Sequence, residues 1–249
     1  MPDIDFVEWK GKKYEVRKDL SLELPMMGIE NILDIINIDK LVHIEELNLS
    51  FNKIKKISGL ENLKNLKILD LRGNEISKIE GLENLVNLAY LMLSENKIEK
   101  IEGLENLENI KLLRLNHNHI KEIEGLDSLW KLDELDLSYN EIKEIKNLQN
   151  NTLLTWLNFC YNQIQEIQGL ECNSMLERLD LGKNEIKVVK GLEELKKLRE
   201  LHLNFNPIER IDNIEPLERL KTLLMSYKSL PDSIREKIRS RFYYDEEIS

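Results

Sequence analysis

Apolar and polar positions along the chain follow one frame that repeats every 22 residues. Residues 69–90 show a complete copy, which reads LDLRGNEISKIEGLENLVNLAY. The common frame is L-x-L-x-x-N-x-I-x-x-I-x-G-L-x-x-L-x-x-L-x-x, and eight copies in constant register fill residues 47–222. A period of this length is typical of a repeat architecture in which each copy forms one structural unit.

Each part of the frame predicts a local structure. The L-x-L pair has the period of a short strand with one buried face. The later leucines recur every third residue, which fits a 3₁₀-like turn better than an α-helix. The glycine suits a turn with unusual φ. A buried asparagine can satisfy loop backbone groups, and the unbroken series is Asn52, Asn74, Asn96, Asn118, Asn140, Asn162, Asn184 and Asn206.

One copy buries too little apolar surface to fold alone, so the copies are expected to stack and the ends to be capped. Residues 25–46 match the frame imperfectly: Glu30 stands at the asparagine position, and Pro25 and Met27 stand at L-x-L. This segment is predicted to be a degenerate first repeat. Residues 1–24 are predicted to form an N-terminal β-hairpin, either as a cap built on Trp9 and Tyr14 or as a binding hairpin.

Residues 223–249 follow the last full copy. A final strand is expected at the start of this segment, and an apolar residue then recurs every fourth position at Leu230, Ile234, Ile238 and Phe242. That stripe predicts an amphipathic helix with Pro231 near its first turn. The helix is expected to cap the last coil, and binding a partner is the alternative.

The frame resembles the 22-residue class of leucine-rich repeats, which occurs in the regulatory repeat subunit of type-one protein phosphatase, in dynein-associated light chains and in bacterial internalins. The match covers about seven tenths of the chain. The resemblance implies an α/β repeat solenoid, curved and right-handed, with a parallel β-sheet on its concave side. It does not transfer any partner-contacting residue, because the matching positions are structural.

Composition narrows the function. The formal net charge of −10 disfavours nucleic acid and anionic membranes as partners. No signal-type or membrane-spanning segment is visible, so a cytoplasmic location is expected. Cys160 and Cys172 are expected to be reduced thiols, although pairing stays open. His117 and His119 could share a metal but lack a third ligand at suitable spacing. We expect no catalytic residue and no cofactor.

Information about partners must therefore lie in positions that point away from the core. Adjacent copies place exposed apolar side chains together on the concave face, and aromatic residues, methionine and arginine are enriched in protein interfaces. One patch is expected at Ile68, Tyr90, Met92 and Leu112 with Arg114 at its edge, and a second at Trp156 with Tyr139 and Tyr161. Asp136 and Asp180 are among the acidic residues expected to favour basic groups on a partner. Scattered surface apolar residues without a role are the alternative.

The resulting hypothesis is a monomeric, non-catalytic adaptor or regulatory subunit that binds a protein with an apolar and basic surface. Two alternatives remain. The chain could be a scaffold in a larger assembly that uses its caps or convex side, or an extracellular recognition protein of the internalin type.

Overall fold

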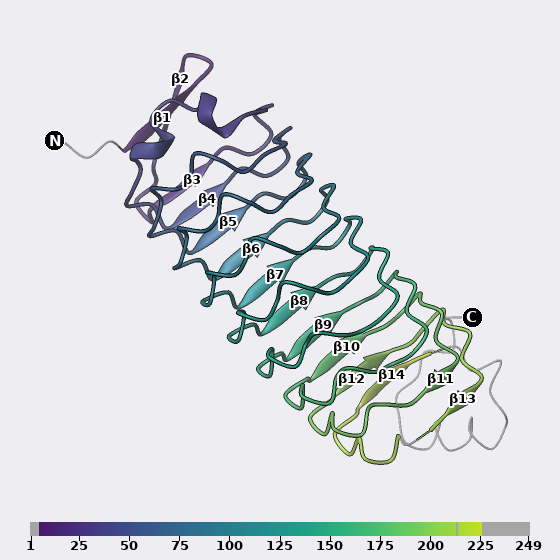
Figure 1. The fold of residues 1–249 in the computed structure, drawn as a ribbon. Coiled ribbons are helices and arrows are strands. Elements are labelled where there is room, and N and C mark those ends of the chain that lie inside the picture. The colour runs from purple at the N-terminus through teal and green to yellow at the C-terminus, as the bar shows by residue number, and fades with distance from the viewer. Residues whose placement is uncertain (1–4, 213, 226–249) are drawn as a thin grey trace.

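The computed structural model describes residues 5–212 and 214–225 and contains a coil of stacked turns along one axis (Figure 1). Each turn contributes one short strand to a ten-stranded parallel sheet. The strands, in their order across the sheet, are β3 (Ser21–Glu23), β4 (Glu46–Asn48), β5 (Ile68–Asp70), β6 (Tyr90–Met92), β7 (Leu112–Arg114), β8 (Glu134–Asp136), β9 (Trp156–Asn158), β10 (Arg178–Asp180), β12 (Glu200–His202) and β14 (Thr222–Leu224).

Strand pairing follows the 22-residue period without slippage from β4 onwards. Leu47 pairs with Leu69, Leu69 with Leu91, and the same one-to-one register continues to β14. The predicted parallel sheet is therefore confirmed, and equivalent side chains of successive copies lie in straight rows.

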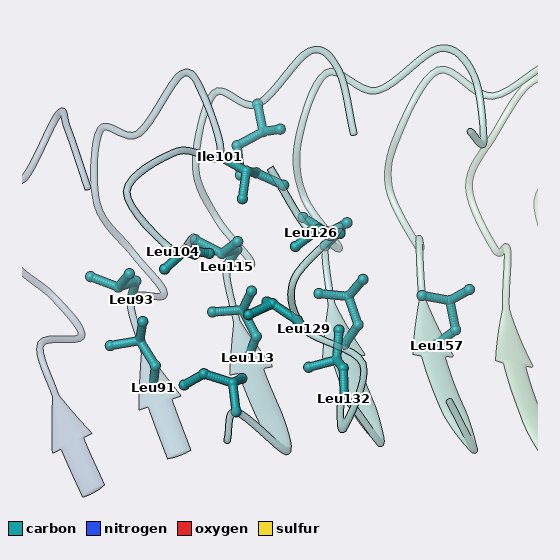
Figure 2. Close-up of a cluster of buried hydrophobic side chains, with 14 of the residues drawn as sticks. Leu91, Leu93, Ile101, Leu104, Leu113, Leu115, Leu126, Leu129, Leu132 and Leu157 are labelled. Carbon is teal, nitrogen blue, oxygen red and sulfur yellow. The ribbon is translucent and has the colours of Figure 1, made fainter. Parts of the chain in front are cut away.

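The core lies between the sheet and the turns on the opposite side of the coil. Figure 2 shows leucines of the strands, such as Leu113, beside leucines of the outer turns, such as Leu129. The outer turns follow the predicted threefold spacing, because the Leu63 N–H donates to the Leu60 carbonyl and the Leu66 N–H donates to the Leu63 carbonyl. Phe159 replaces a strand leucine and is fully buried.

Helix is scarce in the described residues, where it amounts to the single 3₁₀ turns η1 (Ile32–Asp34) and η2 (Ile38–Lys40). The predicted parallel-sheet solenoid is present, but the helical component of the α/β class is not supported in this part of the chain. The physical reason is the threefold leucine spacing, which closes the outer side of each copy with i→i+3 turns. The helix expected near Leu230–Phe242 lies outside the described residues.

The asparagine series forms the predicted internal ladder. Asn74 accepts a hydrogen bond from the Ile54 N–H at 3.0 Å and donates to the carbonyls of Leu49 and Leu71. The same pattern recurs along the series, and all eight side chains are buried. Each amide thus links two neighbouring copies through backbone groups that would otherwise lack a hydrogen-bond partner.

The frame glycines are needed for close packing as well as for backbone shape. Gly81 has a φ of 72°, and a Cβ there would lie 2.5 Å from the Ile57 carbonyl oxygen of the preceding copy. Asn147 takes the place of this glycine in one copy with a φ of 59°. Its amide donates to the corresponding carbonyl, that of Ile123, at 2.7 Å.

The N-terminal hairpin consists of β1 (Phe6–Trp9) and β2 (Lys12–Glu15), which pair antiparallel as expected. Trp9 and Tyr14 pack against the core. A bridge between Glu8 and Ile36 joins the hairpin to the first turn, because each backbone N–H donates to the other residue's carbonyl. These contacts support the capping interpretation of the hairpin.

The first turn corrects the predicted position of the degenerate frame. Leu22 and Leu24, and not Pro25 and Met27, are the L-x-L pair, and Leu22 pairs with Leu47. The first copy is thus 25 residues long. Next to Glu30, the Ile29 N–H donates a hydrogen bond to the Asn52 side chain. The extra apolar triplet delays the next strand by three residues, so β3 lies inside the segment 1–24 expected to be a cap alone.

A second, two-stranded parallel sheet lies near the C-terminal end of the described coil (Figure 1). It pairs β11 (Val188–Val189) with β13 (Arg210–Ile211), again one copy apart.

Candidate functional site

We define the sheet face as the side of the ten-stranded sheet turned away from the core, the side expected to be concave. It carries two rows of side chains, because the middle residue of each strand points inward and the outer two point outward. From β4 to β14 the first row is Glu46, Ile68, Tyr90, Leu112, Glu134, Trp156, Arg178, Glu200 and Thr222. The second is Asn48, Asp70, Met92, Arg114, Asp136, Asn158, Asp180, His202 and Leu224.

The first predicted patch is present as a contiguous cluster. Ile68, Tyr90 and Leu112 are direct partners across β5, β6 and β7, and Met92 is the second-row residue of β6. Tyr90 is 41% exposed, and the other three are half-buried. We call Ile68, Tyr90, Met92 and Leu112 the apolar patch.

Arg114 lies beside the apolar patch and is held by three neighbours. Its guanidinium forms ion pairs with Glu134 at 2.8 Å and Asp136 at 3.4 Å. It also stacks over the Trp156 ring, with 4.2 Å between the guanidinium carbon and the ring centroid. These contacts fix the arginine and the tryptophan before any partner arrives, which lowers the entropic cost of binding.

The second predicted patch is wrong in its grouping. Trp156 contacts Arg114 and lies near Arg178, whereas Tyr139 stacks on Tyr161 at 4.1 Å and on His117 at 4.0 Å. The tyrosines belong to a separate ridge at one edge of the sheet, formed by the residue before each ladder asparagine. From the first turn onwards this edge ridge is Met26, Phe51, Gly73, Glu95, His117, Tyr139, Tyr161, Lys183 and Phe205.

Every member of the edge ridge has a positive φ, between 53° and 64°. This left-handed conformation directs the side chain away from the sheet face, which explains why the tyrosines do not meet Trp156. It costs bulky residues about 1–2 kcal/mol each, and stacking between copies offsets part of that cost. The residue types do not reveal this conformation, since Gly73 is the only glycine in the row.

Three acidic residues of the sheet face, including the two expected to meet a partner, make contacts within the chain. Asp70, Asp136 and Asp180 each accept a hydrogen bond from the backbone N–H two residues later, which turns the chain at the strand end. Asp70 is also paired with Arg72 at 2.6 Å, and Asp180 lies 3.3 Å from His202. The sequence signal for this role is the Asp or Asn that recurs directly after the first strand leucine. Asp136 and Asp180 were expected to face a partner, but they stabilise the turn instead.

The histidines and cysteines have structural surroundings. His117 stacks in the edge ridge, and His119 lies 3.4 Å from Glu141. In residues 5–212 and 214–225 no group of three or more potential metal ligands occurs. Both thiols are free, and burial followed by the charges of Asp180 and Asp136 raises the pKa of Cys160 to about 12. A thiol protonated at neutral pH is a poor nucleophile.

Two further observations concern the rest of the surface. Trp130, on the outer turns, is 48% exposed, and its ring carries the Lys131 ammonium at 4.7 Å. Within the part of the chain that the structure describes, no helix is long and apolar enough to cross a membrane.

Comparison with known proteins identifies the repeat. The family described as leucine-rich repeats (two copies) matches residues 42–84, 64–106, 86–127, 108–150 and 174–218, which together exceed half of the chain. No curated protein matches the chain.

Several solved structures share the fold. Internalin C2 of Listeria monocytogenes is 28% identical, with a TM-score of 0.70 over 81% of this chain and 89% of that one. A leucine-rich repeat protein of Leptospira interrogans is 25% identical, with a TM-score of 0.71 over 83% of this chain. This chain spans only 62% of the Leptospira protein. The internalin inlF of Listeria monocytogenes is 25% identical, with a TM-score of 0.57 over 91% and 86% of the two chains. The chain therefore belongs to the leucine-rich repeat family.

Proposed function

We propose that this chain is a non-catalytic interaction module that binds a protein partner on its sheet face. The observation that carries the proposal is the apolar patch. Its side chains cannot be explained as core, because the core positions of the same strands are already filled by Leu69, Leu91 and Leu113. Clustered exposed apolar residues mark interaction sites more often than isolated ones do.

The neighbourhood of the patch supports this choice. Arg114 and Trp156 are residue types that dominate binding energy in protein interfaces, and they are held rigidly at the patch border. Leucine-rich repeat proteins are typically binding modules without catalytic activity, which agrees with a site that lacks an activated nucleophile in the described residues.

The cellular setting is a separate part of the proposal. We propose a monomeric protein of the cytoplasm with no role for nucleic acid or membrane. The similarity to two internalins favours the alternative of an internalin-type recognition protein, which would also use a protein partner. Fractionation of cells that express the chain naturally distinguishes the two: cytosolic recovery supports the first, and surface or secreted recovery supports the second.

Capture of partners tests the sheet face directly. The double variant Tyr90→Ala, Leu112→Ala removes two side chains from the apolar patch, and Val86→Ala truncates a side chain on the outer turns that is about as exposed as Tyr90. We expect the double variant to lose the partners that the parent chain captures, while Val86→Ala retains them. If the double variant folds and keeps all partners, the sheet face is not the binding surface and the scaffold alternative gains.

A further inference from the structure

The charges around the apolar patch differ from those expected, because three sheet-face carboxylates already have an arginine partner. Asp70 pairs with Arg72, and Glu134 and Asp136 share Arg114. Glu46 is the exception next to the patch. It is the direct strand neighbour of Ile68, and no Lys, Arg or His among the described residues forms an ion pair with it.

The surroundings of Glu46 are acidic. Glu23 lies diagonally from it on β3, opposite Asn48. It pairs with the exposed Arg17 at 3.5 Å and accepts a hydrogen bond from Asn48 at 2.7 Å. Burial, followed by the charges of Glu23 and Asp19, raises the pKa of Glu46. The charge of Arg17 opposes this rise in pKa, but Arg17 is paired with Glu23. The carboxylate of Glu46 is thus half-buried, without an ion-pair partner among the described residues, and adjacent to apolar side chains.

The opposite border of the patch also carries excess negative charge, since Glu134 and Asp136 have one arginine between them. A partner that covers the patch would dehydrate both borders, and dehydrating an unpaired carboxylate is costly. A cation supplied by the partner removes that cost at Glu46. Neighbouring parallel strands are about 4.8 Å apart, so Glu46 lies about 10 Å from Tyr90 along the row.

We propose that the partner is a protein segment that places a bulky apolar side chain on the apolar patch and a Lys or Arg about 10 Å away, where it pairs with Glu46. This inference rests on the proposed function and adds to it the chemistry of the partner. It assigns Glu46 as a residue that selects basic segments over neutral or acidic ones.

A random peptide library displayed on phage and selected on the full chain tests the proposal. Selected peptides are synthesised, and their affinities are measured by calorimetry for the parent chain and for Tyr90→Ala, Glu46→Gln and Glu99→Gln. Glu99 is the matched control, because it is an exposed glutamate outside the sheet face with no ion pair among the described residues.

We expect Tyr90-dependent peptides that contain an apolar residue followed or preceded by Lys or Arg. Glu46→Gln should weaken them about fivefold, as expected for one charge pair, and Glu99→Gln should leave them unchanged. Tyr90-dependent peptides without basic residues, or without sensitivity to Glu46→Gln, would overturn the proposal and leave the proposed function standing. Selected peptides that all ignore Tyr90→Ala would overturn the proposed function, and this proposal with it.

Discussion

Replacement of Asn118 by alanine tests how the asparagine ladder holds the coil together. Asn118 accepts from the Ile98 N–H at 3.0 Å and donates to the carbonyls of Leu93 and Leu115. Both carbonyls keep a second donor in the variant, from Asn96 and Asn140 respectively. The Ile98 N–H has no other acceptor among the described residues, so the variant buries one orphaned donor.

The expected loss follows from these contacts. One orphaned buried donor costs about 1–3 kcal/mol, and weakening two carbonyl bonds adds about 0.5–1 kcal/mol each, so the free energy of unfolding should fall by about 2–5 kcal/mol. Urea unfolding followed by far-ultraviolet circular dichroism measures it. The control is Asn87→Ala, which removes one exposed amide bond to the Lys64 carbonyl. Equal losses for the two variants would refute the assignment of the ladder as the internal tie.

Four further outcomes are expected. Asn173→Leu should change the free energy of unfolding by less than about 1 kcal/mol, because removing the buried Oδ1 that has no hydrogen-bond partner among the described residues offsets the loss of the two bonds that Nδ2 donates to the carbonyls of Leu148 and Asn151; a loss of about 3 kcal/mol or more in urea unfolding would contradict this. Gly81→Ala should destabilise by about 1–3 kcal/mol because of its positive φ and the nearby Ile57 carbonyl, and a neutral result would show that the turn can relax. Trp156→Ala should cost about 1 kcal/mol through its lost stacking with Arg114, and a loss typical of a core residue would mean that the ring is not on the surface. At pH 8 iodoacetamide should modify the exposed Cys172 well before Cys160, because the raised pKa keeps the Cys160 thiol protonated; mass spectrometry of the modified chain checks the order.

The fold could be predicted because every copy of the frame meets the same structural requirements with the same kinds of residue. Leu69, Asn74 and Gly81 each occupy a position with a single requirement, for burial, for backbone hydrogen bonding and for close approach respectively. The first turn was misplaced because its register depends on where three extra residues are accommodated. Pro25 and Met27 lie at the positions that the 22-residue spacing predicts, whereas Leu22 and Leu24 are the residues that fill the core.

The candidate site was predicted only in part. The row of Ile68, Tyr90 and Leu112 followed from strand alternation and constant register. The grouping of Tyr139 and Tyr161 with Trp156 failed because side-chain direction after a strand depends on φ, which a non-glycine residue does not reveal. Ion pairing was also hidden, since it depends on the long side chain of Arg114 crossing to the next strand.

Site-specific photo-crosslinking tests the central claim most directly. A photoreactive phenylalanine analogue is placed at position 90 on the sheet face or at position 86 on the outer turns, in cells that express the chain naturally. Binding on the sheet face predicts a discrete cross-linked protein partner from position 90 and none from position 86. A partner cross-linked from position 86, with none from position 90, would contradict it.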